Sequence, residues 1–383
     1  MSSLSRRSFL GAATTFGLAA RAAGAATAGT PAAPAGAPKF GAALPLTGAY
    51  ALEGDEALRG VLLAIEQVNA QGGIGGKPIA LAQADMPSQS AAAGAVNGLI
   101  SGAHANILFG SGTSALSYPA TAAAELAQTP FIELTAPADG IMTRGFKFLL
   151  RTGPTTNMTG NLAAATIQAR FAGRRLGLLF NTGATGGAIA AAAIAALATA
   201  KVPVTLSAGY PEDAADLYEQ TGRMMRAKVD VLLHAAGPDD VLAFFQAMKV
   251  LNWTPGTLIG CGPGYELRDT AQALGNPLEG TLVIAAPFYP GEAGRIASAY
   301  EARFAVKPRS AQSCTAYVGA KLVFDTLNAA GADPSKLLAM MRKLNLPFGA
   351  LANGFGASFD NTGQNTASFV TLQRWRNGTL IPA

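Results

Sequence analysis

Short apolar runs alternate with longer amphipathic segments along most of this chain. A short apolar run between turn residues is typical of a strand buried on both faces, whereas an apolar repeat near 3.6 residues is typical of a helix. The apolar runs predict strands at residues 40–44, 79–82, 107–109, 131–134, 148–150, 176–180, 202–206, 229–233, 258–259 and 282–285.

The segments between these runs carry helical patterns. One buried stripe follows the i, i+3, i+4, i+7 spacing of a helix and consists of Leu58, Val61, Leu62, Ile65 and Val68. Similar patterns lie at 242–249 and 318–327, and the alanine-rich segment 188–200 predicts a packing helix. Apolar strands joined by helices predict an α/β fold with parallel, helix-covered sheets. Ten strands exceed one comfortable open sheet, so we expect two Rossmann-like lobes.

Composition and charge agree with this prediction and exclude some functions. The chain has 383 residues, half of them apolar and 13% charged, which is enough for two domains with sizeable cores. The formal charge is +5, and three of the arginines lie in the first 28 residues, so the remainder carries 5 − 3 = +2. This balance predicts neither a nucleic-acid partner nor a basic membrane-binding surface.

The first 28 residues have the pattern of a cleavable export signal. Arg6 and Arg7 precede the uncharged stretch 11–20, and small residues follow at 23–28. The arginine pair resembles the twin-arginine class of signals, and the apolar stretch is shorter than the ~20 residues of a membrane span. We therefore expect a soluble periplasmic protein that begins with a linker at 29–38. The alternative interpretation is a basic amphipathic helix.

Two cysteines, Cys261 and Cys314, fall in the exported part of the chain. They could form a disulfide in an oxidising compartment, or remain two free thiols. The second alternative is preferred because Cys314 lies in a segment predicted to be a buried helix.

Three loops have the chemistry of a binding site. They lie at 45–48, 110–114 and 181–186, each after a predicted strand. Clefts in α/β folds form beyond the carboxyl ends of strands, where helix N-termini present free N–H groups. Small hydroxyl residues there suit a carboxylate or another polar head, although serine and threonine are also ordinary helix caps.

The order of several motifs resembles a known family. The motifs are Leu44-Pro45-Leu46-Thr47-Gly48, Gly54-Asp55 with Arg59-Gly60, the segment VNAQGGIGGK at 68–77, the serine-rich loop, Arg144-Gly145, Leu150-Arg151-Thr152, Glu279-Gly280 and 359–363. Together they are similar to the periplasmic leucine/isoleucine/valine-binding proteins of ABC transporters. The resemblance covers essentially the whole mature chain. It implies a type I periplasmic binding protein fold, with two lobes joined by three chain crossings, a ligand in the cleft and no catalytic activity.

The resemblance also implies site residues. A loop serine that holds the ligand carboxylate in the family matches Ser114, which follows Thr113. An Ala/Thr pair matches Thr135 and Pro137, with Ala136 between them, or a two-residue slip places its threonine at Thr135. Because proline has no N–H, the first register loses one donor.

At the remaining matched positions, this chain has residue types that differ from those of the family. A cleft tyrosine matches Glu53, two aromatic positions match Thr185 and the pair Ala236-Gly237, and the carboxylate that pairs with the ligand's amino group matches Gly262. Tyr50 is a further candidate for the cleft wall.

The departure at Gly262 affects the expected ligand. A buried charge without its partner costs about 3–5 kcal/mol, and ~1.4 kcal/mol is a factor of ten in affinity. We therefore expect a small carboxylate or amide rather than leucine, unless Glu53, Glu133 or Glu266 supplies the counter-charge to an amino-acid-like molecule. Glu53 facing solvent at a helix N-terminus is an equal alternative.

Two other functions are alternatives to this hypothesis. The segment 182–187 together with Tyr317 and Lys321 resembles a short-chain dehydrogenase, but Ile189 occupies the third glycine position and no acidic residue follows at ribose distance. His104 and His234 stand alone and are interpreted as surface or capped residues, so no cofactor or metal site is expected. A sensor for a signalling partner remains the other alternative.

The preferred hypothesis is a monomeric carrier that delivers its solute to a transporter permease. Residues 39–152 and 287–358 are expected to form lobe I, and 153–286 and 359–383 lobe II. The ligand stabilises closure through its higher affinity for the closed state.

Overall fold

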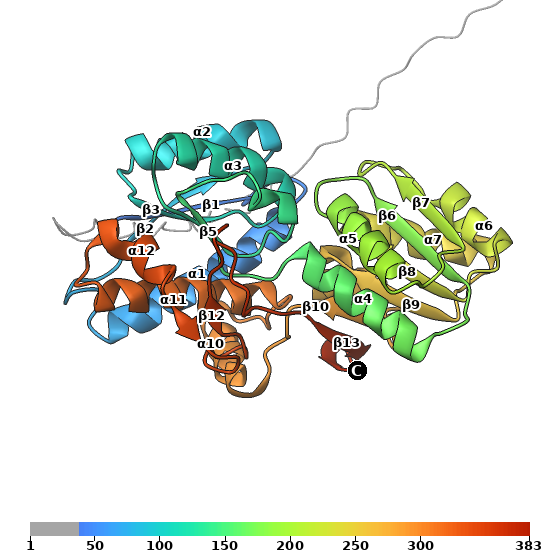
Figure 1. Ribbon diagram of the computed structural model, residues 1–383. Helices are drawn as coiled ribbons and strands as arrows, with labels where there is room; N and C mark the ends of the chain where they lie inside the picture. Colours follow the sequence, from blue (N-terminus) through green and yellow to red (C-terminus); the bar gives the residue numbers. More distant parts are fainter. Residues whose placement is uncertain (1–37) are drawn as a thin grey trace, which may run out of the picture. The chain divides into compact units, whose positions relative to one another are not determined.

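Helices and strands alternate through residues 38–383, the part of the chain that this computed structural model describes. Figure 1 shows two groups of strands, one in the early part of the chain and one in its middle. The predicted export signal at 1–28 and the linker up to residue 37 lie outside the described residues.

The first sheet is entirely parallel and has the strand order β2-β1-β3-β4-β5. Its strands are β1 (Phe40–Leu44), β2 (Leu81–Asp85), β3 (Ile107–Gly110), β4 (Phe131–Glu133) and β5 (Leu149–Arg151). Strands β1, β3, β4 and β5 are buried along their whole length, which explains their uninterrupted apolar sequences.

The second sheet has the order β14-β13-β10-β9-β8-β6-β7. It is parallel from β10 to β7, and a C-terminal antiparallel hairpin completes it. Its strands are β6 (Leu176–Asn181), β7 (Leu206–Tyr210), β8 (Val231–Ala235), β9 (Thr257–Cys261), β10 (Leu282–Ala285), β13 (Thr371–Arg376) and β14 (Thr379–Pro382). A separate short ladder pairs β11 (Asn345–Leu346) with β12 (Ala357–Ser358).

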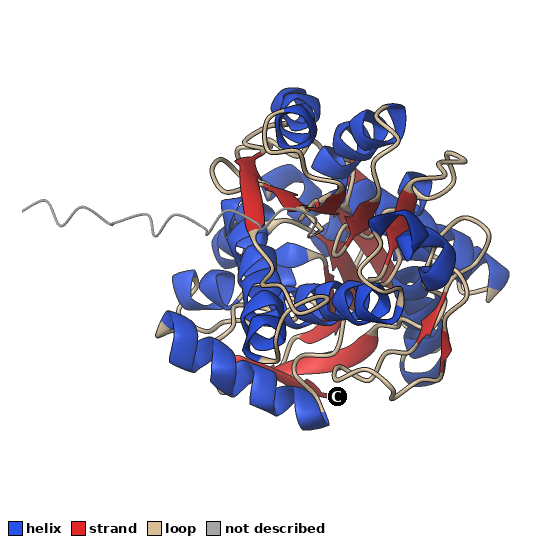
Figure 2. Cartoon of the chain, turned by 90° about the vertical axis from the view of Figure 1, so that its left-hand side faces the viewer, coloured by secondary structure: helices blue, strands red, loops and turns tan. Residues whose placement is uncertain are grey.

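Helices cover both faces of each sheet, and Figure 2 shows helices packed around the strands. They are α1 (Ala51–Ala70), α2 (Gln89–Ser101), α3 (Ser114–Leu126), α4 (Thr156–Arg170), α5 (Gly186–Thr199), α6 (Tyr218–Arg226), α7 (Pro238–Leu251), α8 (Pro263–Glu266), α9 (Arg268–Ala273), α10 (Gly294–Phe304), α11 (Gln312–Ala329) and α12 (Leu337–Met341), with single 3-10 turns at Asp139–Ile141, Gly291–Ala293 and Pro334–Lys336. Helices α1 and α11 pack together on one face of the first sheet, and α2 and α3 on the other. Helices α4 and α5 cover one face of the second sheet, and α6 and α7 the other.

The chain passes between the two sheets three times, after β5, after β10 and after β12. The first and third crossings are hydrogen-bonded to each other: Gln364 Nε2 donates to the Gly153 carbonyl at 3.0 Å, and Asn365 Nδ2 donates to the Thr152 carbonyl at 3.2 Å. The two sheets, their helical layers and the three crossings confirm the predicted two-lobe α/β fold.

Two strand predictions need correction. The predicted strand at 202–206 is loop up to Thr205, and β7 begins at Leu206. Strand β7 lies at the sheet edge and alternates buried and exposed residues, so it lacks the apolar run that was used as the signal. The hairpin of β13 and β14 was missed, although Asn377-Gly378 at its turn, both with positive φ, is a typical hairpin sequence.

Both cysteines are buried and free, as preferred from the sequence. Within residues 38–383, no helix combines the length and the apolar character that crossing a membrane requires.

The close approach of α1 to α11 gives a stability prediction. A Cβ added at Gly60 would lie 2.1 Å from the Ser313 carbonyl oxygen and 2.9 Å from the Tyr317 nitrogen. Because both contacts are backbone atoms, we expect Gly60→Ala to lower the free energy of unfolding by about 2 kcal/mol or more. Denaturant titration measures this value. The control is Gly94→Ala on α2, where a Cβ meets nothing within 4 Å and should stabilise by about 0.5–1 kcal/mol. Equal stability of Gly60→Ala and wild type would contradict the packing.

Candidate functional site

A cleft lies where the carboxyl ends of the strands in the two sheets meet. It consists of two adjoining cavities with empty volumes of about 700 and 610 Å³. Both cavities are lined by Glu53, Thr113, Thr185, Ile189, Gly262 and Pro263. These residues come from the start of α1 and the loop before α3 on one side, and from the starts of α5 and α8 on the other. This is the place where α/β folds bind small molecules.

The structure brings most of the sequence-predicted site residues together here. The first cavity is lined by Glu53, Thr113, Thr135, Pro137, Thr185 and Gly262. The second is lined by Tyr50, Glu53, Thr113, Thr185, Ala236, Gly237 and Gly262. Ser114 and Ala136 line neither cavity: both are buried, and Ser114 Oγ accepts a hydrogen bond from the Ala138 nitrogen at 3.2 Å.

The carboxylate of Glu133 holds the loops on the first side of the cleft. Its Oε1 accepts hydrogen bonds from the nitrogens of Ser111 (2.8 Å), Thr135 (3.2 Å) and Ala136 (3.0 Å). Its Oε2 accepts from the hydroxyls of Ser111 at 2.7 Å and Ser117 at 2.5 Å. Glu133 is completely buried, so these five bonds compensate the cost of burying a charge. One of these donors is the Thr135 nitrogen, which lies at a position that the family resemblance assigned to ligand binding.

Arg151 fixes the same loop from behind. It is almost fully buried, and its Nη1 donates to the carbonyls of Ala136 (3.1 Å) and Ala138 (2.8 Å). Its Nε donates to Gln364 Oε1 at 2.5 Å, in the third chain crossing. Burial lowers the pKa of the Arg151 guanidinium to about 10. The Arg151 side chain therefore anchors the hinge and does not line either cavity.

Glu53 faces the cleft with an unused oxygen. The residue is only 2% exposed, and its Oε2 has no hydrogen-bond partner within the described chain. Loss of solvent raises the pKa of Glu53 to about 7, and the charges of Asp239 and Glu212 add to this effect. The alternative of a solvent-facing Glu53 is therefore wrong.

Glu266 approaches from the other side, on α8. Its pKa is also raised to about 7, first by burial and then by the charge of Glu53. Two carboxyl groups on elements of different sheets thus act on each other across the first cavity, which both of them line.

The cleft lining is acidic. Besides Glu53 and Glu266 it contains Glu212, Asp239 and Asp240, and neither cavity is lined by a lysine, arginine or histidine. Glu212 Oε1 accepts a hydrogen bond from the Tyr50 hydroxyl at 2.7 Å, and Asp240 Oδ2 accepts from Asn181 Nδ2 at 2.6 Å. A ligand carboxylate would meet no cationic side chain in this cleft.

Further unsatisfied polar atoms lie in the first cavity. In the described part of the chain, six buried side-chain oxygens or nitrogens lack a partner, and three of them belong to residues that line this cavity. These three are Glu53 Oε2, Gln312 Oε1 and Thr315 Oγ1. Buried polar atoms are normally hydrogen-bonded, so their concentration here indicates a place that a ligand completes.

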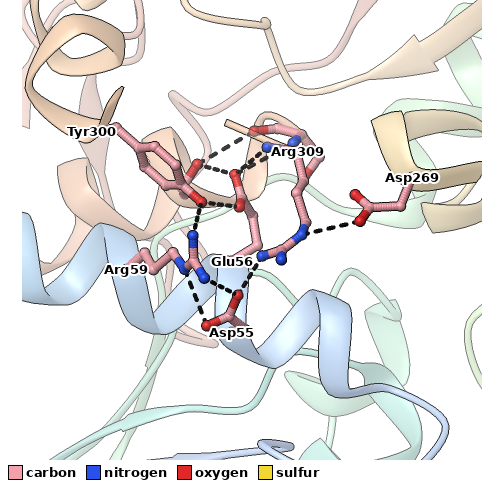
Figure 3. A network of polar contacts seen from close by, with 8 residues as sticks. Asp55, Glu56, Arg59, Asp269, Tyr300 and Arg309 are labelled. Atoms are coloured by element: carbon pink, nitrogen blue, oxygen red, sulfur yellow. Dashed lines mark hydrogen bonds and ion pairs between the residues drawn. The ribbon is translucent and has the colours of Figure 1, made fainter. Parts of the chain in front are cut away.

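Polar contacts connect the two sides of the cleft. Thr185 Oγ1 lies 3.4 Å from both Thr113 Oγ1 and the Ser114 nitrogen. At the rim, Arg309 contacts Asp55 of α1 and donates from Nε to Asp269 of α9 at 3.3 Å (Figure 3).

The same network anchors α1. Glu56 is buried and accepts hydrogen bonds from the Tyr300 hydroxyl at 2.7 Å, from the Arg309 nitrogen at 3.0 Å and from Ser313 (Figure 3). Glu56 follows Glu53 by three residues, so fixing it also fixes the turn that presents Glu53 to the cleft.

The dehydrogenase alternative does not fit this arrangement. Lys321 bonds to Asp325 at 2.6 Å, and the Tyr317 hydroxyl bonds to Gln67, so neither side chain is directed to the loop at 182–187. Within residues 38–383, no group of three or more histidine, cysteine or acidic residues is arranged to hold a metal ion.

The interpretation of His234 as a surface or capped residue is wrong. It is completely buried in β8, between the hydroxyls of Tyr210 (2.7 Å) and Tyr265 (2.6 Å), and burial lowers its pKa to about 3. His104 is exposed, as expected.

Sequence reasoning missed several lining residues, notably Glu212, Asp239, Asp240, Gln312 and Thr315. Asp239 and Asp240 had a signal, since they open a helix directly after Gly237 at the carboxyl end of a predicted strand. Glu212 was missed because β7 was placed four residues too early, which moved its carboxyl end away from this position.

The Glu133 hydrogen bonds predict a strong effect of a small change. In Glu133→Gln an NH₂ group replaces one of the two oxygens that accept from five donors, so at least one buried donor loses its acceptor. We expect the free energy of unfolding to fall by about 2 kcal/mol or more, as measured by denaturant titration. The control Glu219→Gln, at an exposed surface pair, should change it by less than about 0.5 kcal/mol. Similar values for the two variants would contradict the role of Glu133.

The raised pKa of Glu53 predicts a pH effect on stability. The folded state keeps the Glu53 proton up to a pH near 7, whereas the unfolded chain releases it near 4.5. The stability that this proton provides is therefore complete below the pKa of the unfolded chain, and it is lost as the pH rises through the pKa of the folded state. Relative to Glu53→Gln, the ligand-free wild type should lose on the order of 2–3 kcal/mol between about pH 5 and pH 8, by denaturant titration. A constant difference between the two proteins would exclude the raised pKa.

Comparisons with known proteins agree with this fold. A family model described as periplasmic binding protein matches residues 37–379. Leu/Ile/Val-binding protein homolog 8 of Brucella abortus is 30% identical over 354 residues, and the match covers 88% of each chain. Homolog 7 of Brucella suis has the same identity and coverage.

Solved structures share the fold at lower identity. Leucine-binding protein LivK of Thermotoga maritima superposes with a TM-score of 0.78 at 18% identity, over 90% of this chain and 97% of that one. LivJ of Streptococcus pneumoniae, in complex with isoleucine, gives 0.79 at 19% identity with the same coverage. A solute-binding protein of an ABC transporter from R. palustris, in complex with benzoate, gives 0.77 at 21% identity, over 90% and 95%. The chain therefore belongs to the periplasmic binding protein family, together with the Leu/Ile/Val-binding proteins.

Proposed function

We propose that this chain is the extracytoplasmic solute-binding protein of an ABC importer. It binds a small amino-acid-like, organic-acid or amide molecule in the cleft and delivers it to the permease as a monomer. The observation that carries this proposal is the first cavity of the cleft, of about 700 Å³, whose lining includes Glu53, Gln312 and Thr315, each with an unpartnered polar atom. Export through the twin-arginine-type signal at 1–28 is part of the same proposal.

The names of relatives support this function. Curated relatives are called Leu/Ile/Val-binding protein homologues, and solved structures of the same fold hold isoleucine or benzoate. Those solutes differ in charge and shape, which indicates that the fold accepts different small organic molecules and that the lining residues select among them.

The mechanism is closure of two lobes about the three crossings. Lobe I consists of residues 39–152 and 287–358, and lobe II of 153–286 and 359–383. Contacts between the sides, such as Tyr50 with Glu212 and Thr113 with Thr185, form only when the lobes are close together. A solute that touches both sides adds to these contacts and stabilises the closed state by its differential affinity. The permease then distinguishes the closed from the open protein.

Identification of a co-purified molecule tests this proposal. Protein purified from its native compartment under mild conditions should release a small organic molecule, which mass spectrometry identifies. Adding that molecule back to stripped protein should reduce the radius of gyration in X-ray scattering and raise the Tm.

A matched pair of variants localises the effect. Ala286 lines the first cavity, so Ala286→Trp should fill the cleft and abolish both responses. Val250 is exposed on α7, and Val250→Trp should leave both responses unchanged. Full responses in Ala286→Trp, or none in the wild type, would count against binding in the cleft.

A further inference from the structure

The charge of the cleft limits the solute it accepts. Glu53, Glu212, Glu266, Asp239 and Asp240 line its two cavities, and none of the lining residues is basic. The buried arginine behind the first side, Arg151, is already bonded to two loop carbonyls and to Gln364. Such a site repels a free carboxylate and attracts a positive charge.

One of these carboxyl groups specifically lacks a donor. Glu53 is 2% exposed, and its Oε2 has no partner although the residue lines both cavities. A buried carboxylate oxygen without a hydrogen bond is costly, and a protonated amine supplies up to three N–H donors together with the opposite charge.

A second carboxyl group faces Glu53 from the other side of the cleft. Glu266 lies on α8, and its charge and that of Glu53 oppose each other. A cation between them would pair with both and replace their repulsion by two attractions. Helix α1 packs with the first sheet and α8 with the second. A cation can therefore contact both carboxyl groups only when the cleft is closed.

The first side of the cleft has little to offer a carboxylate. The nitrogens of Ser111, Thr135 and Ala136 donate to Glu133, and Pro137 has no N–H. The Ser114 nitrogen faces Thr185 Oγ1 at 3.4 Å. Three backbone donors on this side are thus occupied by Glu133, and the polar groups left in the lining are uncharged or acidic.

Part of the remaining wall is apolar, beside the neutral polar groups of six threonines and Gln312. Ile189, Ile284 and Val370 line the first cavity together with three prolines. Apolar walls suit the carbon skeleton of an organic molecule and disfavour a hydrated metal ion.

We propose that the solute is an organic cation, a protonated amine that needs no carboxylate, held between Glu53 and Glu266. This inference rests on the proposed function and names the charge of its solute: the cleft binds the ammonium group, and an acid group on the solute adds nothing to binding. Tyr50, Glu212, Asp239 and Asp240 are the other titratable groups of the lining, and Cys261 lies near Glu266. None of these groups supplies a positive charge that competes with the ligand.

A set of matched solutes tests which charge on the solute the cleft binds. Leucine, isoamylamine, isocaproate and isocaproamide share a similar carbon skeleton and differ in their charged groups. They are added, with putrescine as a further protonated amine, to the full exported protein after stripping. We expect at least one cation to raise the Tm and to bind in calorimetry about tenfold or more tightly than leucine, and isocaproate to have no effect.

Two variants test the residues. Glu53→Gln and Glu266→Gln should each weaken binding of the best cation by about tenfold or more, while the exposed control Glu301→Gln should not change it. Glu53→Gln should also be at least as stable as the wild type at neutral pH, so loss of binding in it cannot be attributed to unfolding.

The outcomes separate this inference from the proposed function. Tighter binding of isocaproate, isocaproamide or leucine than of every cation would overturn the inference and leave the proposed function intact. Cation binding that survives both glutamine substitutions would overturn the assigned residues. If no solute of any charge raises the Tm, both proposals fail.

Discussion

The buried carboxylate of Glu133 determines the shape and the chemistry of the first side of the cleft. It lies at the end of β4 and collects three backbone nitrogens and two hydroxyls from the loops after β3 and β4. Those loops would otherwise present free donors at the carboxyl edge of a parallel sheet. The Glu133 carboxylate accepts from these donors, and the five hydrogen bonds fix the conformation of the two loops.

The hinge is likewise held by buried hydrogen bonds between groups of the chain itself. Arg151 is the last residue of β5, bonds to the carbonyls of Ala136 and Ala138, and reaches Gln364 in the third crossing. Gln364 in turn donates to the Gly153 carbonyl in the first crossing. A chain of buried bonds therefore links the cleft wall to two of the three connections between the sheets. A disturbance of the loop at 135–138 would be transmitted directly to the hinge.

On the second side of the cleft, the carboxyl group lies at a different position from the one that the family resemblance implies. Gly262, which matches the family carboxylate, has a φ of 86° and lies at the start of α8 with only backbone facing the cavity. A carboxyl group appears instead at Glu266, at the end of the same helix, and another at Glu53 on α1. In the proposed site, the counter-charge to the ligand lies on this pair of carboxyl groups, one on each side of the cleft. Such a pair makes the electrostatic contribution of a ligand depend on closure.

The sequence by itself determined the α/β class, the two lobes and the edge at which the site lies. Uninterrupted apolar strands are readable because burial on both faces leaves no polar alternation, and the loops that follow them must gather at the carboxyl edge. It also identified Glu53, Thr113, Thr135, Thr185 and Gly262, all of which line the cleft.

Only the tertiary structure decided the state of the acidic residues. Glu53, Glu133 and Glu266 are equivalent letters in the sequence, but Glu133 has five donors, Glu53 has an oxygen without any, and Glu266 faces Glu53. Edge strand β7 and the position of Glu212 were likewise invisible, because an edge strand lacks the apolar run of a central one. The availability of a carboxylate for a ligand depends on hydrogen bonds between residues far apart in the chain, and no local pattern records those bonds.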